Sequence, residues 1–155
     1  MDKVITTALL IIAGVVCTVL VINSVYPAVN RSSAAMVSIA EKANNRVRSN
    51  IEIIQTANVP PGVFIWVKNV GACRIASIEQ SDVFFGELGN FERVPHEDYT
   101  ESLPYWDYKI NNDNEWTPMA TLEITIHLSS PPSSGSYFVK MIIPNGISDE
   151  YVFSI

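Results

Sequence analysis

The sequence is poor in charge, in cysteine and in histidine. Only 17% of its 155 residues are charged, against about 25% in a typical soluble domain. Its two cysteines, Cys17 and Cys73, stand far apart in unlike surroundings, which excludes a disulfide framework. The net charge of -6 excludes the basic footprint of a nucleic-acid-binding protein. We therefore expect no nucleic-acid partner.

The scarcity of histidine also limits the chemistry that the chain can perform. His96 and His127 are the two histidines, and neither lies in a nucleophile, phosphate-loop or zinc motif. His127 falls on the polar side of an alternating run, where we expect it to face solvent. Asn111–Glu115 offers oxygen ligands for calcium but lacks the spacing and glycine of an EF-hand, so a polar surface turn is favoured. We expect no enzymatic activity, no cofactor and no metal.

What the sequence does contain is a long uncharged segment near its start. From Val4 to Asn30 no residue carries a charge. A helix of about 20 apolar residues crosses a bilayer core, whereas the apolar part of a cleavable signal has about 7–15. We predict a retained hydrophobic helix that lies in the membrane before any assembly. Asn30-Arg31-Ser32 is an acceptor sequon at the edge of this segment, which makes Asn30 a candidate glycosylation site.

A helical period continues beyond the uncharged segment. Apolar residues recur with a mean spacing of 3.6 and no glycine or proline interrupts 28–59, although Pro27 can kink or break the helix. We predict one helix of about 45–50 residues, assigned to residues 1–50. The stripe is made of Met36, Ala40, Ala43, Val47, Ile51 and Ile54.

Small and apolar positions on this helix are candidates for helix–helix packing. Thr7, Gly14 and Thr18 recur at spacings of seven and four, near one stripe on which small residues allow close approach. The alternative is that they are simply tolerated in a single span. The later stripe must pack against either the following domain or a neighbouring copy. The predicted packing residues are Thr7, Gly14, Thr18, Met36, Ala40, Ala43 and Val47.

Charge is divided unequally along the chain. Residues 31–48 carry four cations and one anion, whereas 49–155 carry five cations and fourteen anions. A basic stalk and an acidic head permit electrostatic complementarity between subunits, or contact of the stalk with anionic lipid head groups. The cations that follow the apolar run favour a cytoplasmic head by the positive-inside rule, although a lone span with a translocated domain obeys that rule weakly.

Residues 51–155 show the alternating pattern of β-strands separated by turn residues. Thr121–Leu128 alternates cleanly between apolar and polar residues, and the region has the size and punctuation of an antiparallel, immunoglobulin-like β-sandwich. Within the less regular 90–118, four aromatic residues belong either to the core or to a contact patch: Tyr105, Trp106, Tyr108 and Trp116. The predicted strands are Val63–Asn69, Ile75–Gln80, Asp82–Phe85, Thr121–Leu128, Tyr137–Ile143 and Tyr151–Ile155.

This α+β plan, a long N-terminal hydrophobic helix followed by a β-sandwich head, resembles that of the archaellins. Archaellins are the filament subunits of the archaeal motility organelle and relatives of type IV pilins. The start MDKVITTALLIIAGVVCTVLVINSVYPAVNRSSAAM is also similar to the archaellum accessory protein G. Only Met1-Asp2-Lys3 precedes the apolar run, without the leader junction of archaellins, and Ile5 occupies the region where bacterial pilins place a glutamate. We therefore expect either an unprocessed chain or an accessory protein.

The resemblance implies a structural subunit of an extracellular surface filament for motility. Its partners would be copies of itself in a helical homopolymer, together with the archaellum assembly machinery. One alternative is a single-pass membrane-anchored accessory or stator protein of the archaellum. A second is a membrane-tethered extracellular binding module.

Overall fold

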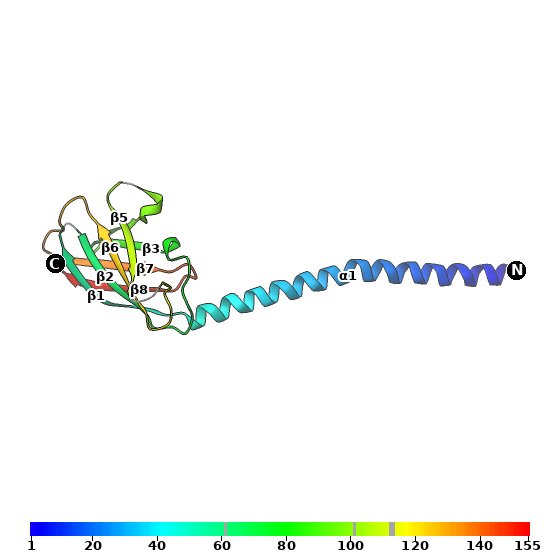
Figure 1. Ribbon diagram of the computed structural model, residues 1–155. Coiled ribbons are helices and arrows are strands. Elements are labelled where there is room, and N and C mark those ends of the chain that lie inside the picture. Colours follow the sequence, from blue (N-terminus) through cyan, green and yellow to red (C-terminus); the bar gives the residue numbers. More distant parts are fainter. Residues whose placement is uncertain (61, 101, 112–113) are drawn as a thin grey trace. The chain divides into compact units, whose positions relative to one another are not determined.

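The computed structural model describes residues 1–60, 62–100, 102–111 and 114–155. The chain begins with one long helix, α1, which spans Asp2–Arg48 (Figure 1). The helix continues through Pro27, as the prediction of one helix of about 45–50 residues requires. Apart from Gly14 and Pro27 its interior contains no glycine or proline, and it extends to Arg48.

The rest of the described chain forms an antiparallel β-sandwich, as predicted. The first sheet has the order β1-β2-β6-β5, from β1 (Ile51–Val59), β2 (Gly62–Asn69), β5 (Tyr105–Ile110) and β6 (Thr121–His127). The second has the order β4-β3-β7-β8, from β3 (Asp82–Glu87), β4 (Asn90–Val94), β7 (Ser136–Ile142) and β8 (Ser148–Ser154). Two short 3-10 helices, η1 (Ile78–Gln80) and η2 (Glu97–Tyr99), lie in the connections.

Two predictions about local structure are wrong. The helical stripe does not include Ile51 and Ile54, which belong to β1; Ile51 is buried in the sandwich, and Ile54 sits at a register shift in the β1–β2 pairing. Ile75–Gln80 is not a strand, because Ile75 makes an isolated bridge to Trp116 and η1 follows. In both places tertiary pairing overrides the local pattern.

The core fills the space between the two sheets. Trp106 and Trp116 are both fully buried, which places them in the core rather than in a contact patch, whereas Tyr105 and Tyr108 are half-buried. The irregular region thus contributes two strands, β4 and β5, and the two largest core side chains. Other fully buried core residues include Ile65, Leu122, Ile124, Ile126, Val139 and Met141.

Hydrogen bonds between the sheets tie together both pairs of edge strands. On one side, the Ile53 N–H at the register shift in β1 donates to the Asp149 carboxylate of β8 at 2.7 Å. On the other side, the Trp106 N–H of β5 donates to the carbonyl oxygen of Pro95, just after β4, at 2.9 Å. Each of the two openings between the sheets is thus crossed by at least one hydrogen bond.

The chain divides into two compact units, 1–43 and 44–155. The last turn of α1 therefore belongs with the sandwich. There the Ala72 N–H donates to the Arg48 carbonyl oxygen at 2.7 Å. Gly71 allows this close approach, since a Cβ atom at that position would lie 2.5 Å from the Asn50 nitrogen. The predicted domain boundary between 50 and 51 remains a prediction.

Candidate anchor and docking surfaces

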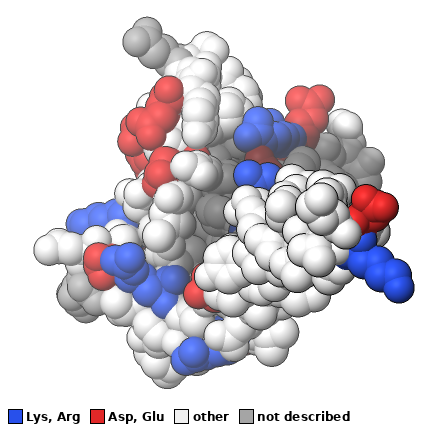
Figure 2. Space-filling view, turned by 90° about the vertical axis from the view of Figure 1, so that its right-hand side faces the viewer, with Lys and Arg blue, Asp and Glu red and all other residues white. Residues whose placement is uncertain are grey.

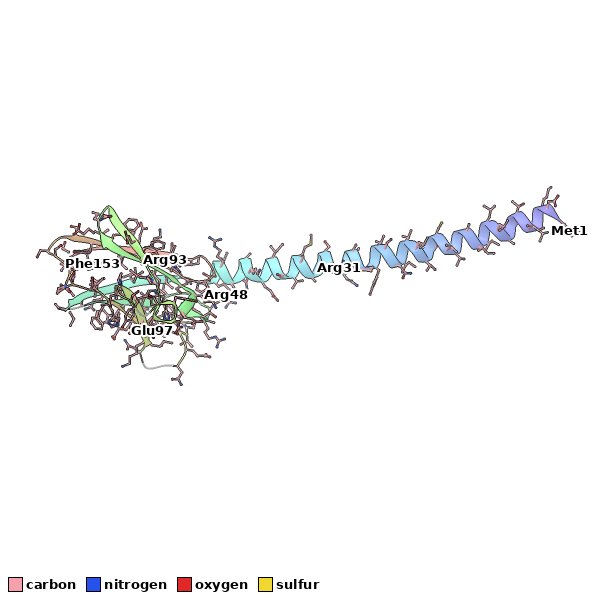
Figure 3. The ribbon with its side chains drawn as sticks, turned by 90° about the horizontal axis from the view of Figure 1, so that it is seen from above. Met1, Arg31, Arg48, Arg93, Glu97 and Phe153 are labelled. Carbon is pink, nitrogen blue, oxygen red and sulfur yellow. The ribbon has the colours of Figure 1, made fainter. Side chains whose placement is uncertain are left out.

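The surface of α1 is the first candidate functional feature. Every residue from 2 to 48 is exposed, and Figure 3 shows its side chains projecting from the helix all along its length. The helix is long and apolar enough to cross a membrane, and it lies near the N-terminus. Its uncharged part, Val4–Asn30, spans about 40 Å at 1.5 Å per residue, against a hydrocarbon core of about 30 Å. An exposed apolar helix of this length requires lipid or other helices around it.

Three threonine hydroxyls in the apolar part of α1 are satisfied by the helix itself. The Thr6 hydroxyl donates to the Asp2 carbonyl oxygen at 2.7 Å, Thr7 to Lys3 at 2.6 Å, and Thr18 to Gly14 at 2.8 Å. Such back-bonding gives each of these three hydroxyl hydrogens an acceptor in an apolar medium. These threonines are therefore compatible with a span that has no helical neighbour as well as with a packed helix.

All the predicted packing residues lie on α1, and all are exposed: Thr7, Gly14, Thr18, Met36, Ala40, Ala43 and Val47. Met36 is 69% and Val47 84% exposed, so the chain by itself covers neither. Asn30 is also exposed on α1. Their roles in packing and in glycosylation remain predictions.

The outer face of the second sheet carries a group of apolar side chains that we call the phenylalanine face: Phe84, Phe91, Phe138 and Val152. Phe91 is 44% and Val152 52% exposed. The face arises because alternate residues of β3, β4, β7 and β8 point away from the core, as the burial of Val83, Phe85, Val139 and Met141 shows.

Two ion pairs lie on the same strands as the phenylalanine face, Asp82–Arg93 and Lys140–Glu150. An apolar centre with a charged border is the usual composition of a protein–protein interface.

The outer face of the first sheet has a different chemistry. Tyr105 stacks on His127 with ring centroids 4.6 Å apart, and His127 Nε2 lies 3.0 Å from the Asp107 carboxylate. Trp66 donates its indole N–H to Glu123 at 2.9 Å. His127 therefore has two partners and is partly covered, rather than simply facing solvent as predicted. Tyr105 and Trp66 on this face thus have polar neighbours, whereas Phe64 stacks on Trp66 with ring centroids 6.1 Å apart.

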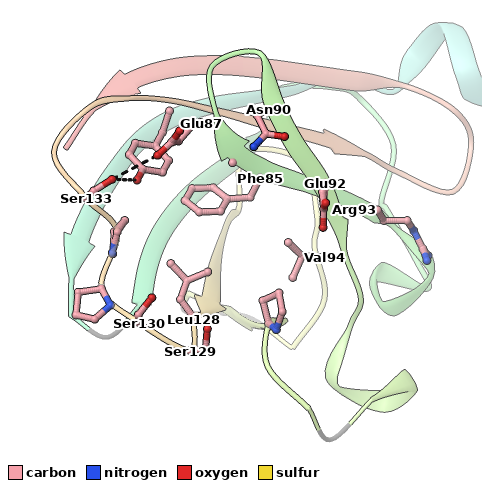
Figure 4. A pocket seen from close by; sticks show the side chains of 15 residues that line it. Phe85, Glu87, Asn90, Glu92, Arg93, Val94, Leu128, Ser129, Ser130 and Ser133 are labelled. Atoms are coloured by element: carbon pink, nitrogen blue, oxygen red, sulfur yellow. Dashed lines mark hydrogen bonds between the residues drawn. The ribbon is translucent and has the colours of Figure 1, made fainter.

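One end of the sandwich contains a pocket of about 460 Å³ (Figure 4). Phe85 and Tyr137 lie against each other in its wall, with ring centroids 5.5 Å apart. The Ser133 hydroxyl donates to the Glu87 carboxylate at 3.4 Å and shares a hydrogen bond with the Tyr137 hydroxyl at 3.2 Å, in which either oxygen can donate. This pocket is one candidate place for the alternative binding-module function.

Within the described part of the chain, the other motifs noted in the sequence form no chemical site. His96 is buried against Trp106, and its Nδ1 accepts the Asp98 N–H at 3.2 Å, which caps η2. Of the suggested calcium turn, Asn112 and Asp113 lie outside the described residues. Among the residues that are described, no three His, Cys, Asp or Glu side chains gather as a metal site would require. Figure 2 shows both acidic and basic side chains on the visible face.

Comparison with known proteins identifies the class to which this architecture belongs. No protein-family model matches the chain. An uncharacterised protein of Archaeoglobus fulgidus is 27% identical over 163 residues and is matched over 98% of both chains. Among solved structures, the archaellum periplasmic stator protein FlaG from Sulfolobus acidocaldarius is 31% identical with a TM-score of 0.61, covering 68% of this chain and 99% of that one. A chain of the archaellum periplasmic stator protein complex of FlaF and FlaG from the same organism is 31% identical with a TM-score of 0.60, covering 67% of this chain and 88% of that one.

The helix and sandwich thus define an archaellum-associated protein. More particularly, the chain belongs to the family of the archaellum protein FlaG. This agrees with the similarity of its first residues to the archaellum accessory protein G. The archaellin filament subunit, the main expectation from the sequence, is less well supported than the accessory protein.

Proposed function

We propose that this chain is a membrane-anchored accessory protein of the archaellum that acts as part of its stator. The observation that supports this most directly is the 31% identity to a protein described as a periplasmic stator, over 99% of that protein's solved chain. The fully exposed apolar α1 complements it, because a stator subunit must be held in place while another part of the machine turns. The membrane is the anchor that such a helix fits.

In this proposal the head lies outside the cytoplasmic membrane and binds another archaellum protein. Support comes from the solved complex of FlaF and FlaG, in which the similar protein has a partner. The cations at Arg31, Lys42, Arg46 and Arg48 would then lie on the outer side, against the positive-inside rule. The orientation of the head outside the membrane is therefore the part of the proposal that an experiment can refute most directly.

A second candidate function is the helical filament, for which the exposed stripe of α1 provides a specific argument. If α1 leaves the lipid, the predicted packing residues from Thr7 to Val47 would contact copies of α1 in a bundle, with the sandwich outside. Lipid is as apolar as such a bundle, so close packing at Gly14 would have to favour assembly. A heterologous contact that does not close would then give an open helix.

Locating the full-length chain in its native cells distinguishes these functions. We expect it in the membrane fraction, with the head digested by protease added outside wall-stripped cells, and absent as a major component from sheared archaella. A strain without the gene should fail to swim. Finding the chain as a major component of purified filaments would support the filament subunit instead, and a head protected from external protease would refute a stator outside the membrane.

A further inference from the structure

Strand β4 has its polar and apolar sides reversed near the turn that joins it to β3. By register, Glu92 is opposite Phe85 and Asn90 is opposite Glu87, and the burial of Phe85 shows that this side of the sheet faces the interior. Phe91 lies between Asn90 and Glu92, points outward and is 44% exposed. A strand that only covers a core carries apolar residues inside and polar residues outside. The reversal therefore places polar groups where the sandwich opens.

The reversed residues line the pocket of about 460 Å³ at this end of the sandwich. Figure 4 shows Asn90 and Glu92 on one side of the pocket and the serines of the β6–β7 connection, Ser129, Ser130 and Ser133, across from them. The apolar part of the lining consists of Phe85, Val94, Leu128 and Tyr137. Ligand sites typically have roughly 300–1,000 Å³ and combine an apolar lining with a few polar groups. The pocket thus has the size and the composition of a binding site.

The charge of the pocket is negative and is not balanced by the chain itself. Glu87 and Glu92 both line it, and within the described residues neither takes part in an ion pair. Arg93 also lines the pocket, but its Nε donates to the Asp82 carboxylate at 2.5 Å, and Figure 4 shows its side chain extending away from the pocket. Two carboxylates are therefore available to a cation that enters from outside.

The two carboxylates are close enough to share one cation. Glu87 and Glu92 are diagonal neighbours on adjacent strands, since Glu87 is opposite Asn90, and such neighbours lie about 7–8 Å apart, within reach of long side chains. The Glu87 carboxylate also accepts the Ser133 hydroxyl at 3.4 Å, which holds it beside the Tyr137 ring. A guanidinium group presents five N–H donors in a planar fork and suits two such acceptors.

Protection of an exposed sheet edge explains only part of this arrangement. An inward-pointing charge on an edge strand discourages pairing with another chain, and β4 is an edge strand. Glu87, however, belongs to β3, which has a neighbouring strand on both sides. Edge protection therefore accounts for Glu92 but not for Glu87. A ligand with an apolar stem and a cationic end accounts for both carboxylates and for the apolar lining.

We infer that this pocket binds the side chain of an arginine or lysine from another protein. The aliphatic stem contacts Phe85, Val94 and Leu128, and the cation lies at Glu87 and Glu92. The partly enclosed apolar surroundings strengthen the attraction between the charges. The site goes beyond the proposed stator function, and only the source of the cation, a partner protein, rests on that proposal.

A binding measurement with small probes tests the charge that the pocket selects. The full-length chain is placed in nanodiscs of phosphatidylcholine, which carries no net charge. Nα-acetyl-arginine amide and its uncharged analogue Nα-acetyl-citrulline amide are titrated and followed by saturation-transfer difference NMR. The arginine probe should bind saturably and roughly five-fold or more tightly than the citrulline probe. Equal affinities, or no binding of the arginine probe, would overturn the inference.

Charge variants test which carboxylates are responsible. Glu87→Gln and Glu92→Gln should each weaken binding of the arginine probe roughly five-fold or more, because each removes one of the two negative charges of the pocket. The matched control is Glu52→Gln, at an exposed carboxylate on β1 outside the pocket, which should leave the affinity unchanged. Equal weakening by all three variants would show attraction to the acidic head in general and would contradict a site.

A steric variant locates the probe without changing any charge. Ser130 and Ser134 are both exposed on the β6–β7 connection, so the fold should tolerate a larger residue at either, but only Ser130 lines the pocket. Ser130→Trp should weaken binding of the arginine probe roughly five-fold or more by filling the entrance, and Ser134→Trp should not. Unchanged binding in Ser130→Trp would refute the inference. These measurements do not depend on membrane orientation or swimming, so failure here is distinct from failure of the stator proposal.

Discussion

At the scale of single residues, Asn69 shows how much a buried polar side chain can organise. It is fully buried, and its amide nitrogen donates to the carbonyl oxygens of Cys73 at 2.9 Å and Trp116 at 3.1 Å. Its amide oxygen accepts the Gly71 N–H at 3.0 Å. One side chain thus connects the end of β2, the turn beside α1 and the loop before β6. The sequence predicts only that Asn69 ends a strand, because its partners are brought close by the fold.

Tyr108 provides a prediction about pH. Burial raises the pKa of its phenol above the ordinary value of 10.0, and the carboxylates of Glu79, Asp98 and Glu97 raise it further. The folded state therefore binds this proton more tightly than the unfolded state, and its contribution to stability is lost as the pH rises from 10 through the folded pKa. Tyr108→Phe should lessen the loss of stability between about pH 9 and 11. Urea unfolding followed by tryptophan fluorescence measures this.

The control for this prediction is Tyr99→Phe, at a tyrosine that is 62% exposed. That variant should keep the alkaline loss of the wild-type protein. If Tyr108→Phe and the wild-type protein lose stability in parallel over this pH range, the burial of the Tyr108 phenol has no energetic effect.

At the scale of elements, α1 combines two segments with different requirements. From Val4 to Asn30 its surface is uncharged, and from Arg31 onward charged residues alternate with the apolar stripe. Val15→Lys should therefore weaken membrane insertion by about 3 kcal/mol, the cost of a lysine near the centre of a span. Val37→Lys, at an equally exposed valine beyond Arg31, should have little effect. Alkaline extraction of membranes should release the first variant and retain the second, and equal release of both would refute an anchor limited to Val4–Asn30.

The strands show where local pattern is sufficient and where it is not. Thr121–His127 is recognisable because alternation of apolar and polar residues sets which side of a strand is buried. Ile51 and Ile54 fit a helical stripe equally well in the sequence, but in the structure their segment pairs with β2 and buries Ile51 and Ile53. Short apolar runs next to a long helix are ambiguous for this reason, since only the partner strand decides between the two periods.

At the scale of the whole molecule, the two compact units have different sources of stability. Residues 44–155 contain the entire hydrophobic core, whereas α1 up to Ala43 is fully exposed. We expect a chain of residues 44–155 to fold without the anchor and to unfold cooperatively at nearly the temperature of the full-length protein. Differential scanning calorimetry of both chains tests this. An aggregated or non-cooperative 44–155 would show that α1 contributes to the core.

The sequence by itself determined the long uncharged helix, the β-rich head and the resemblance to an archaellum protein, because helix period, length and alternation are local properties. It also identified the residues exposed on α1 as candidates for packing, although it did not decide between lipid and helix neighbours. Only the tertiary structure decided that Trp106 and Trp116 are core, that Asn69 joins three segments, and that Phe91, Phe138 and Val152 share one surface. These facts depend on pairing between strands far apart in sequence, and the register of such pairs is fixed by the packing of the whole sandwich.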